Sequence, residues 1–297
     1  MKRNIAIWGL MTGLFLFTAK QSNAQLNPLA AMYYQNQYLG NPAMVGIDRG
    51  LSFNLGYRAQ WNGTPGSPVT QSVTGNYGVT DRMGLGINVS NDKIGLQRWT
   101  RAVASYAYHL PLNGNGDQLH FGLSFGFSNE RLNENMVNGD PTDVGISQYN
   151  QRSTYVDGDF GIAYTANRLT LQAALPNLKS VFHKNDLNNL VDQSTFYTAA
   201  SYRLSLSEGE EGVDVEPKVA LRGVKGYKDI FDAGANLVFA NKRVNVYGLY
   251  HSTESYTFGV GMQYQGLNLS GSYTSGTSAL RGYVDGNFEL SLRIRVF

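Results

Sequence analysis

Histidine is the side chain that most often carries acid–base chemistry or binds a metal. The chain has four, and no two have the spacing of metal ligands. They are His109, His120, His183 and His251. Two have a carboxylate nearby, Asp186 and Glu254, but both pairs fall in predicted loops, where polar residues need no catalytic explanation. The Gly-x-Ser-x-Gly spacing occurs at 122–126, but within an alternating strand run and not at a strand-to-helix turn, so it forms no nucleophile elbow, and no phosphate-loop motif is present. We therefore predict no catalytic residues, metal site or cofactor, with a surface hydrolase using His183 and His251 as a weak alternative.

Three acidic stretches are the other candidates for binding chemistry. Asp157-Gly158-Asp159 and Asp285-Gly286-Asn287 cluster oxygen atoms, as Ca²⁺ sites do, but neither completes an EF-hand loop. Polar turns or a polar barrel interior explain them better. The run Glu208-Gly209-Glu210-Glu211 is most simply a solvated turn, and docking of a basic partner is its alternative interpretation.

The composition narrows the class of protein. The 297 residues include no cysteine, which excludes disulfides and thiolate metal sites. The formal net charge of +2 is too balanced for a nucleic-acid-binding surface. Only 15% of residues are charged, the mean hydropathy is −0.28, and Gly (34), Tyr (19) and Phe (14) are abundant. This balance is typical of a transmembrane barrel with an apolar outside and a polar inside. A large soluble β-protein is the alternative that composition leaves open.

Residues 1–24 have the pattern of a secretory signal peptide. Lys2 and Arg3 give it a positive start, an apolar core follows, and Ala24 places a small residue at the cleavage edge. We therefore expect the mature chain to begin at Gln25. No later apolar run approaches the roughly 18 residues of a membrane-spanning helix. A β-barrel is then the main way in which the mature chain could span a bilayer.

Two regions follow the signal peptide. Residues 25–48 are irregular and rich in Tyr, Asn and Gln, and we predict a short helical or irregular segment that plugs or caps the periplasmic mouth of a barrel. From residue 49 to 297, apolar and polar residues alternate, as they do when successive side chains of a strand point to opposite faces. The clearest runs are 51–61, 83–90, 119–127, 256–264 and 288–296. Residues 49–297 are therefore predicted to form an outer-membrane antiparallel β-barrel.

The connections between the runs support this architecture and give about fourteen strands. Shorter turns are expected around 80–82, 111–117, 166–168, 207–212, 240–242 and 265–266. Mostly roomier connections are expected at 62–67, 91–98, 129–150, 176–193, 223–229, 251–255 and 274–284. An even strand number with short turns on one rim and long loops on the other is typical of bacterial outer-membrane barrels. It predicts that both termini and the short turns face the periplasm, and that the long loops face outside.

Several basic residues fall on the polar phase of their strands and should therefore face the lumen. They are Arg58, Lys218, Arg222, Arg293 and Arg295. Pairing with Glu216, Glu289 or Asp159 is one interpretation. A polar gating network or an anion-selective pore is the other, and the sequence is compatible with both.

The first part of the chain also resembles a known family. The segment YLGNPAMVG at 38–46 is similar to the NPA-containing start of the PorP/SprF-type membrane proteins of the type IX secretion and gliding systems of Bacteroidetes. Further similarities follow in order: YRAQW and GTP within 57–65, MGLG and NDKIG within 83–95, and SYAYHL and LHFGL within 105–123. These motifs cover about residues 25–127, and beyond them only the barrel pattern continues.

The resemblance implies a non-enzymatic outer-membrane component that serves secretion or surface attachment of large adhesins. The implied partners are a secreted adhesin or its C-terminal domain, periplasmic lipoproteins or peptidoglycan-linked subunits of the secretion machine, and outer-membrane lipid, with no nucleic acid. The candidate docking or lumen residues are Asn41, Pro42, Arg58, Trp61, Asp92, Arg222 and Arg293. The alternative function is a passive pore for small solutes, although the bulky residues Tyr33, Tyr34 and Tyr38 favour a plugged lumen.

Overall fold

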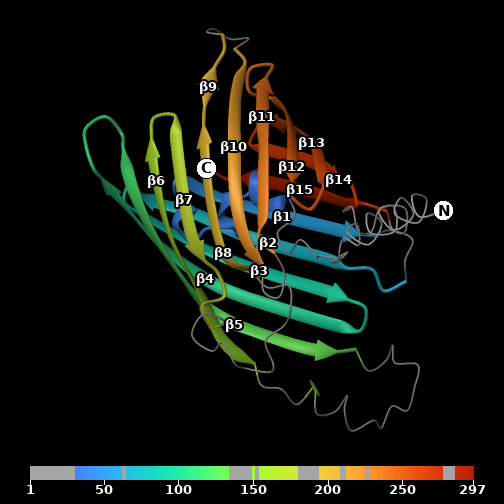
Figure 1. The fold of residues 1–297 in the computed structure, drawn as a ribbon. Helices are drawn as coiled ribbons and strands as arrows, with labels where there is room; N and C mark the ends of the chain where they lie inside the picture. Colours follow the sequence, from blue (N-terminus) through green and yellow to red (C-terminus); the bar gives the residue numbers. More distant parts are fainter. Residues whose placement is uncertain are drawn as a thin grey trace, which may run out of the picture.

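The structure, a computed structural model, shows one antiparallel sheet that closes into a barrel (Figure 1). The residues it describes are 31–61, 65–133, 149–150, 154–179, 194–207, 212–224, 228–276 and 285–297. The predicted signal peptide, the His183 and Asp186 pair and the acidic run at 208–211 lie outside these residues. Among the described residues, no helix has the length and hydrophobicity to cross a membrane.

Each strand pairs with its neighbours in the chain, and the last strand pairs with the first. The strands are β1 (Gly50–Gln60), β2 (Val69–Thr80), β3 (Met83–Ile94), β4 (Gln97–Pro111), β5 (Gln118–Leu132), β6 (Tyr155–Ala166), β7 (Leu169–Leu175), β8 (Ser194–Tyr202), β9 (Leu204–Ser205), β10 (Asp214–Val224), β11 (Ile230–Phe239), β12 (Val244–His251), β13 (Ser255–Tyr264), β14 (Leu267–Thr274) and β15 (Asn287–Arg295). The short β9 and β8 both pair with β10 and form one interrupted barrel strand. Over the described residues the barrel therefore has fourteen strands, as predicted, and the β1–β15 pairing leaves no open edge.

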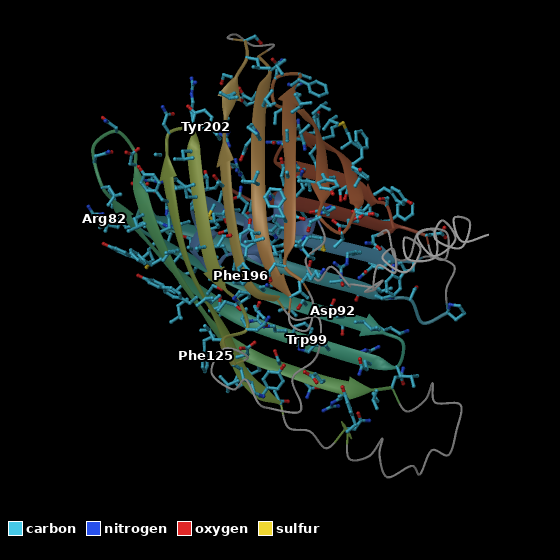
Figure 2. All side chains as sticks on the ribbon, in the orientation of Figure 1. Arg82, Asp92, Trp99, Phe125, Phe196 and Tyr202 are labelled. Atoms are coloured by element: carbon cyan, nitrogen blue, oxygen red, sulfur yellow. The ribbon has the colours of Figure 1, made fainter. Side chains whose placement is uncertain are left out.

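The alternation along each strand separates an apolar outside from a polar inside. On β5, Leu123 and Phe125 are 55% and 62% exposed, whereas Ser124 between them is buried in the lumen. Phe125 accordingly projects from the outer surface of the wall (Figure 2). Large apolar side chains are exposed in the same way on strands all around the barrel. This arrangement reverses that of a soluble protein and matches the lipid-facing band of a membrane barrel.

The two rims differ as the sequence predicts, with two corrections. The short-turn rim carries the connections at 81–82, 112–117, 167–168, 206–213, 240–243 and 265–266, and the long-loop rim carries the others. Figure 2 shows Arg82 and Tyr202 toward the first rim and Asp92 and Trp99 toward the second. The expected loop at 91–98 is wrong, because β3 and β4 stay paired as far as Ile94 and meet in a two-residue turn. The connection at 251–255 also shortens, to 252–254.

The N-terminal segment lies inside the barrel. Its described part contains α2 (Met32–Gln35) and two single 3₁₀ turns, η1 (Gln37–Leu39) and η2 (Pro42–Met44). At one end, Gly46 packs against Gly84 close to the short-turn rim. At the other end, the Ala31 N–H donates to Glu289 in the long-loop half of the lumen. We call residues 31–49 the plug. The described part of the predicted segment therefore lies within the lumen, deeper than a cap on the mouth of the barrel would.

Candidate functional site

The plug is bonded to walls on opposite sides of the lumen. Its polar contacts join Ala31 to Glu289 of β15, Tyr33 to Asp232 of β11, Asn36 to Thr74 of β2, Gln37 to Gln172 of β7, Tyr38 to Ser105 of β4 and Asn41 to Ile162 of β6. These wall residues come from distant parts of the sequence. The plug therefore crosses the lumen as an integral part of the folded barrel.

Glycines on the lumen face of the wall let the plug backbone come close. A Cβ on Gly122 of β5 would overlap the backbone of Pro42 and Ala43, and a Cβ on Gly161 of β6 would overlap the Asn41 side chain. Neither glycine has a positive φ. Glycine is therefore needed at these positions because it leaves space for a close backbone approach.

Asn41 and Pro42, two of the predicted docking residues, shape this contact. Asn41 caps η2, because its Oδ1 accepts a hydrogen bond of 2.9 Å from the Ala43 N–H, and Pro42 occupies the first position of that turn. The Asn41 Nδ2 donates to the Ile162 carbonyl at 3.0 Å. Both residues are buried. They hold the plug against the wall and offer no exposed docking surface.

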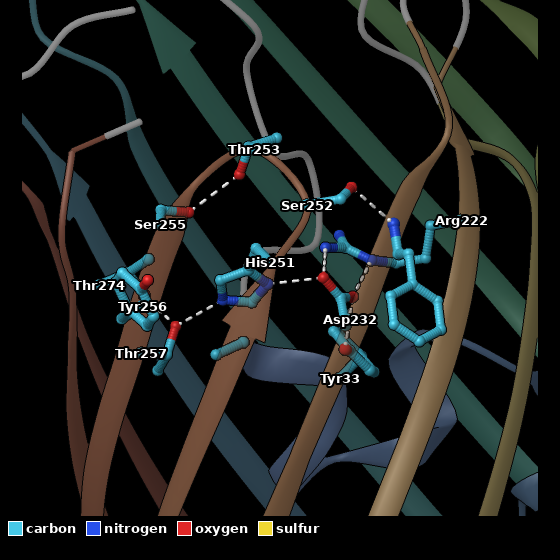
Figure 3. A network of polar contacts seen from close by, with 12 residues as sticks. Tyr33, Arg222, Asp232, His251, Ser252, Thr253, Ser255, Tyr256, Thr257 and Thr274 are labelled. Atoms are coloured by element: carbon cyan, nitrogen blue, oxygen red, sulfur yellow. Dashed lines mark hydrogen bonds and ion pairs between the residues drawn. The ribbon is translucent and has the colours of Figure 1, made fainter. Parts of the chain in front are cut away.

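Asp232 of β11 is the most heavily bonded anchor of the plug (Figure 3). Its carboxylate accepts from the Tyr33 hydroxyl at 2.7 Å, from Arg222 Nε at 2.7 Å and Nη2 at 3.1 Å, and from His251 Nδ1 at 2.6 Å. Arg222 and Asp232 are each only 1% exposed. Hydrogen bonds to a charged group are stronger than neutral ones. This cluster therefore ties the plug to β10, β11 and β12 at once.

The cluster continues through His251 to two threonines. The His251 Nδ1 lies 2.6 Å from Asp232, its Nε2 lies 2.7 Å from the Thr257 hydroxyl, and Thr257 lies 2.6 Å from the Thr274 hydroxyl. Carboxylate, imidazole and hydroxyl in this order are the parts of a hydrolase relay. Here Arg222 neutralises the carboxylate, and both threonines are buried and bonded to each other. The arrangement anchors the plug, and it gives the hydrolase alternative no accessible nucleophile.

His109 of β4 and His120 of β5 form a second buried pair. They are partners in the strand register, their Nδ1 atoms lie 2.7 Å apart, and His120 Nε2 lies 2.8 Å from the Thr165 hydroxyl. One ring must donate to the other. The spacing of these two histidines in the sequence did not indicate this contact. Within the residues that the structure describes, no group of three His, Cys, Asp or Glu side chains could hold a metal ion.

Three further predicted residues lie in or near the long-loop half of the lumen. Arg58 is buried on β1 and faces Thr70 of β2 in the register. The Thr70 hydroxyl donates to Asp92 of β3 at 2.5 Å. Trp61 follows the end of β1, and its backbone N–H donates to the Gly286 carbonyl at 3.2 Å. Arg58 and Asp92 therefore belong to the lumen wall, whereas Trp61 belongs to the rim.

The two remaining predicted arginines both contact the plug or its anchor. Arg293 Nη2 donates to the Gln35 carbonyl at 2.8 Å. Arg222 pairs with Asp232 instead of the carboxylates that the sequence offered. Those carboxylates were Glu216, Glu289 and Asp159. The two arginines therefore help to hold the plug in the lumen.

The Asp157-Gly158-Asp159 stretch faces an arginine that sequence reasoning missed. Arg101 of β4 lies 2.7 Å from Asp159 and 3.5 Å from Asp157. Asp159 also accepts from the Asn177 N–H at 3.0 Å. The stretch thus forms part of a paired lumen wall, as its polar interpretation predicted. Arg101 and Asp232 both fall on the lumen phase of their strands, which was the signal that could have found them.

Comparisons with known proteins agree with this architecture. The family described as "Type IX secretion system membrane protein PorP/SprF" matches residues 22–294. Among solved structures, the outer membrane protein Omp33 of Acinetobacter baumannii is similar over 84% of this chain and 99% of its own, with 7% identity and a TM-score of 0.50. An engineered variant of the porin of Rhodopseudomonas blastica matches over 82% and 99%, with 12% identity and a TM-score of 0.34. No curated protein matches the chain. The likeness to Omp33 shows the barrel fold alone.

Proposed function

Because the chain belongs to the PorP/SprF family of type IX secretion system membrane proteins, we propose that it is a plugged docking component of that system. Its barrel fold and its family together indicate the outer membrane. In this proposal the protein catalyses no reaction. It binds a secreted adhesin, or the adhesin's C-terminal domain, and periplasmic subunits of the secretion machine.

The observation that carries the proposal is the plug. It is bonded across the lumen through buried contacts, which join Tyr33 to Asp232, Ala31 to Glu289 and Tyr38 to Ser105. A partner that crossed the lumen would have to break these contacts. A partner that binds at a rim leaves these contacts intact. Docking at a rim therefore costs less free energy than passage through the lumen.

We assign the two rims to different partners. The long-loop rim holds the secreted partner, because its larger connections offer more variable surface. The short-turn rim meets the periplasmic machine, and charged side chains such as Arg82, Arg168 and Lys242 are exposed there for polar contacts. The plug then separates the two partners.

Co-purification tests the proposal directly. The tagged barrel is extracted from its native membrane in mild detergent, and an unrelated outer-membrane barrel with the same tag serves as the control. We expect an adhesin or secretion-system subunits with the first protein and not with the second. Recovery of neither, together with normal adhesin secretion after deletion of the gene, would remove the proposal.

Single-channel recording discriminates the alternative of a passive pore. The purified barrel in a planar bilayer should show no steady current, because the plug crosses the lumen. A large and steady conductance in the unmodified protein would favour a solute channel.

A further inference from the structure

Three basic residues lie side by side on the outer face of the barrel, near the long-loop rim. Lys93 of β3 is opposite Arg98 of β4 in the strand register, and Arg98 is opposite Arg131 of β5. All three follow the lipid-facing phase of their strands, which also carries the exposed Val89 and Phe127. Arg98 and Arg131 are exposed, and Lys93 is half-buried. We call these three residues the cationic row; it crosses three neighbouring strands (Figure 1).

The positive charges of the cationic row have no carboxylate opposite them. In the part of the chain that the structure describes, no ion pair involves any of the three. The residue opposite Lys93 on β2 is Val69, and the nearby Asp92 and Glu130 follow the lumen phase of their strands. Like charges directly opposite each other on antiparallel strands are destabilising. An anionic ligand on the outer face would therefore relieve a repulsion that is built into the wall.

Two further rows lie between the cationic row and the middle of the wall. The polar row consists of Asn91, Thr100 and Asn129, and the apolar row consists of Val89, Ala102 and Phe127. Toward the rim, the outer face thus changes from apolar side chains to hydrogen-bonding groups and then to positive charge. An anionic lipid has the same order of groups, from acyl chains through ester or amide linkages to phosphate.

The position of the cationic row matches the depth of lipid headgroups. A strand crosses a bilayer in about 9–11 tilted residues. β3 has 12 residues, counted from the short-turn rim, and Lys93 is the last but one. Neighbouring strands are about 4.8 Å apart, so the row is roughly 10 Å wide. This width suits a headgroup with more than one phosphate, and guanidinium groups bind phosphate through paired hydrogen bonds.

We propose that the cationic row binds the phosphorylated headgroup of a lipid in the leaflet on the long-loop side. The polar row bonds the linkages of its acyl chains. With the long loops outside, this is the outer leaflet of the outer membrane, and the ligand is a diphosphorylated glucosamine lipid of the lipid A class. An acidic protein segment would satisfy the charges only, and would leave the two lower rows without a role. Binding of the lipid depends on the proposed orientation of the barrel, and it does not depend on adhesin docking.

Native mass spectrometry of the purified barrel, released from detergent micelles, tests the proposal by counting bound lipid. EDTA is present throughout, so that divalent cations cannot bridge phosphates to carboxylates. We expect saturable binding of diphosphorylated lipid A. Lipid A without its phosphates should bind much more weakly, and phosphatidylglycerol, with one phosphate, should lie between the two.

Two triple variants show whether the cationic row is the site. The first is Lys93→Gln, Arg98→Gln and Arg131→Gln, and it should weaken lipid A binding about tenfold or more, which corresponds to the loss of at least one charged hydrogen bond. The control removes the same charge from exposed positions at the short-turn rim and should bind lipid A as the unmodified protein does; it is Arg82→Gln, Arg168→Gln and Arg243→Gln.

Thermal unfolding in the same detergent separates lost binding from misfolding. Without lipid, the first variant should unfold at the same temperature as the unmodified protein or at a higher one, because the repulsion is gone. Lipid A should raise the unfolding temperature of the unmodified protein and of the control, and not that of the first variant.

Three results would overturn the proposal. The first is equal binding of lipid A by both triple variants, and the second is equal binding of lipid A with and without its phosphates. The third is saturation by inorganic phosphate or a poly-glutamate peptide at the same concentrations as lipid A, since the row would then bind anions in general. These measurements use only the barrel and added ligands, so failure of the docking function is detected separately.

Discussion

Replacing Asp232 by Asn should destabilise the barrel more than any other single change in the lumen network. The carboxylate accepts two hydrogen bonds from the fully buried Arg222 and one each from Tyr33 and His251. The amide would remove the countercharge and present its own N–H groups to these donors. Leaving one member of a buried ion pair uncompensated costs about 3–5 kcal/mol, and we expect this loss in the free energy of unfolding.

Two matched variants give a scale for this prediction. Tyr33→Phe removes one hydrogen bond to a charged acceptor and should cost about 1.5–3 kcal/mol. Asp214→Asn breaks the ion pair with the exposed Lys242, whose atoms are 3.8 Å apart, while the amide oxygen can still accept the 2.8 Å hydrogen bond from Ser205, and should cost about 0–1 kcal/mol. Guanidinium unfolding in detergent micelles, followed by tryptophan fluorescence, measures all three. If Asp232→Asn proved as stable as Asp214→Asn, the cluster would not be the anchor that its geometry indicates.

Three further changes probe the plug contact, the lipid face and the rim. Gly122→Ala forces a Cβ into the plug backbone, so it should lower the free energy of unfolding by about 1–3 kcal/mol and give a measurable conductance. Gly114→Ala is the control, because its Cβ meets nothing within 4 Å, and it should do neither. Leu123→Arg places a charge on the exposed outer face of mid-β5 and should cost about 2–4 kcal/mol in lipid unfolding titrations, against about 0–1 kcal/mol for Leu112→Arg at the rim. A hydrogen bond from the Arg49 guanidinium lowers the pKa of the exposed Asp81 carboxyl. The stabilisation by this Arg49–Asp81 contact is therefore present above about pH 4 and is lost as the pH falls further. In Asp81→Asn, the part of the free energy of unfolding that is lost below about pH 4 should therefore be absent when stability is measured against pH.

The sequence predicted the wall well because the wall obeys a local rule. The alternation at 119–127 follows from the opposite orientation of successive side chains, and it needs no knowledge of distant residues. The loop expected at 91–98 fails for a related reason. Asn91, Asp92 and Lys93 have the composition of a loop, but near the rim of a barrel both faces of a strand can be polar. Local composition therefore could not separate strand from loop there.

The site was less predictable because its contacts are set by the plug. Tyr33 and Asp232 are 199 positions apart, and their bond depends on how the plug sits against a wall that must already be closed. The pair His109 and His120 is different. A hairpin turn at 112–117 brings these two positions into register, so extending the strand pairing from the predicted turn would have found it.

The distribution of close contacts along the plug bears on how the barrel can work. Near the short-turn rim the plug backbone packs against glycines, as Gly46 does against Gly84, and its chain continues directly into β1. Toward the long-loop rim it is held by side chains and borders a cavity of about 130 Å³. A group arriving from the long-loop side can therefore enter this cavity without displacing any part of the plug. The same group arriving from the other side meets packed backbone, and this asymmetry favours recognition at the long-loop rim over passage through the lumen.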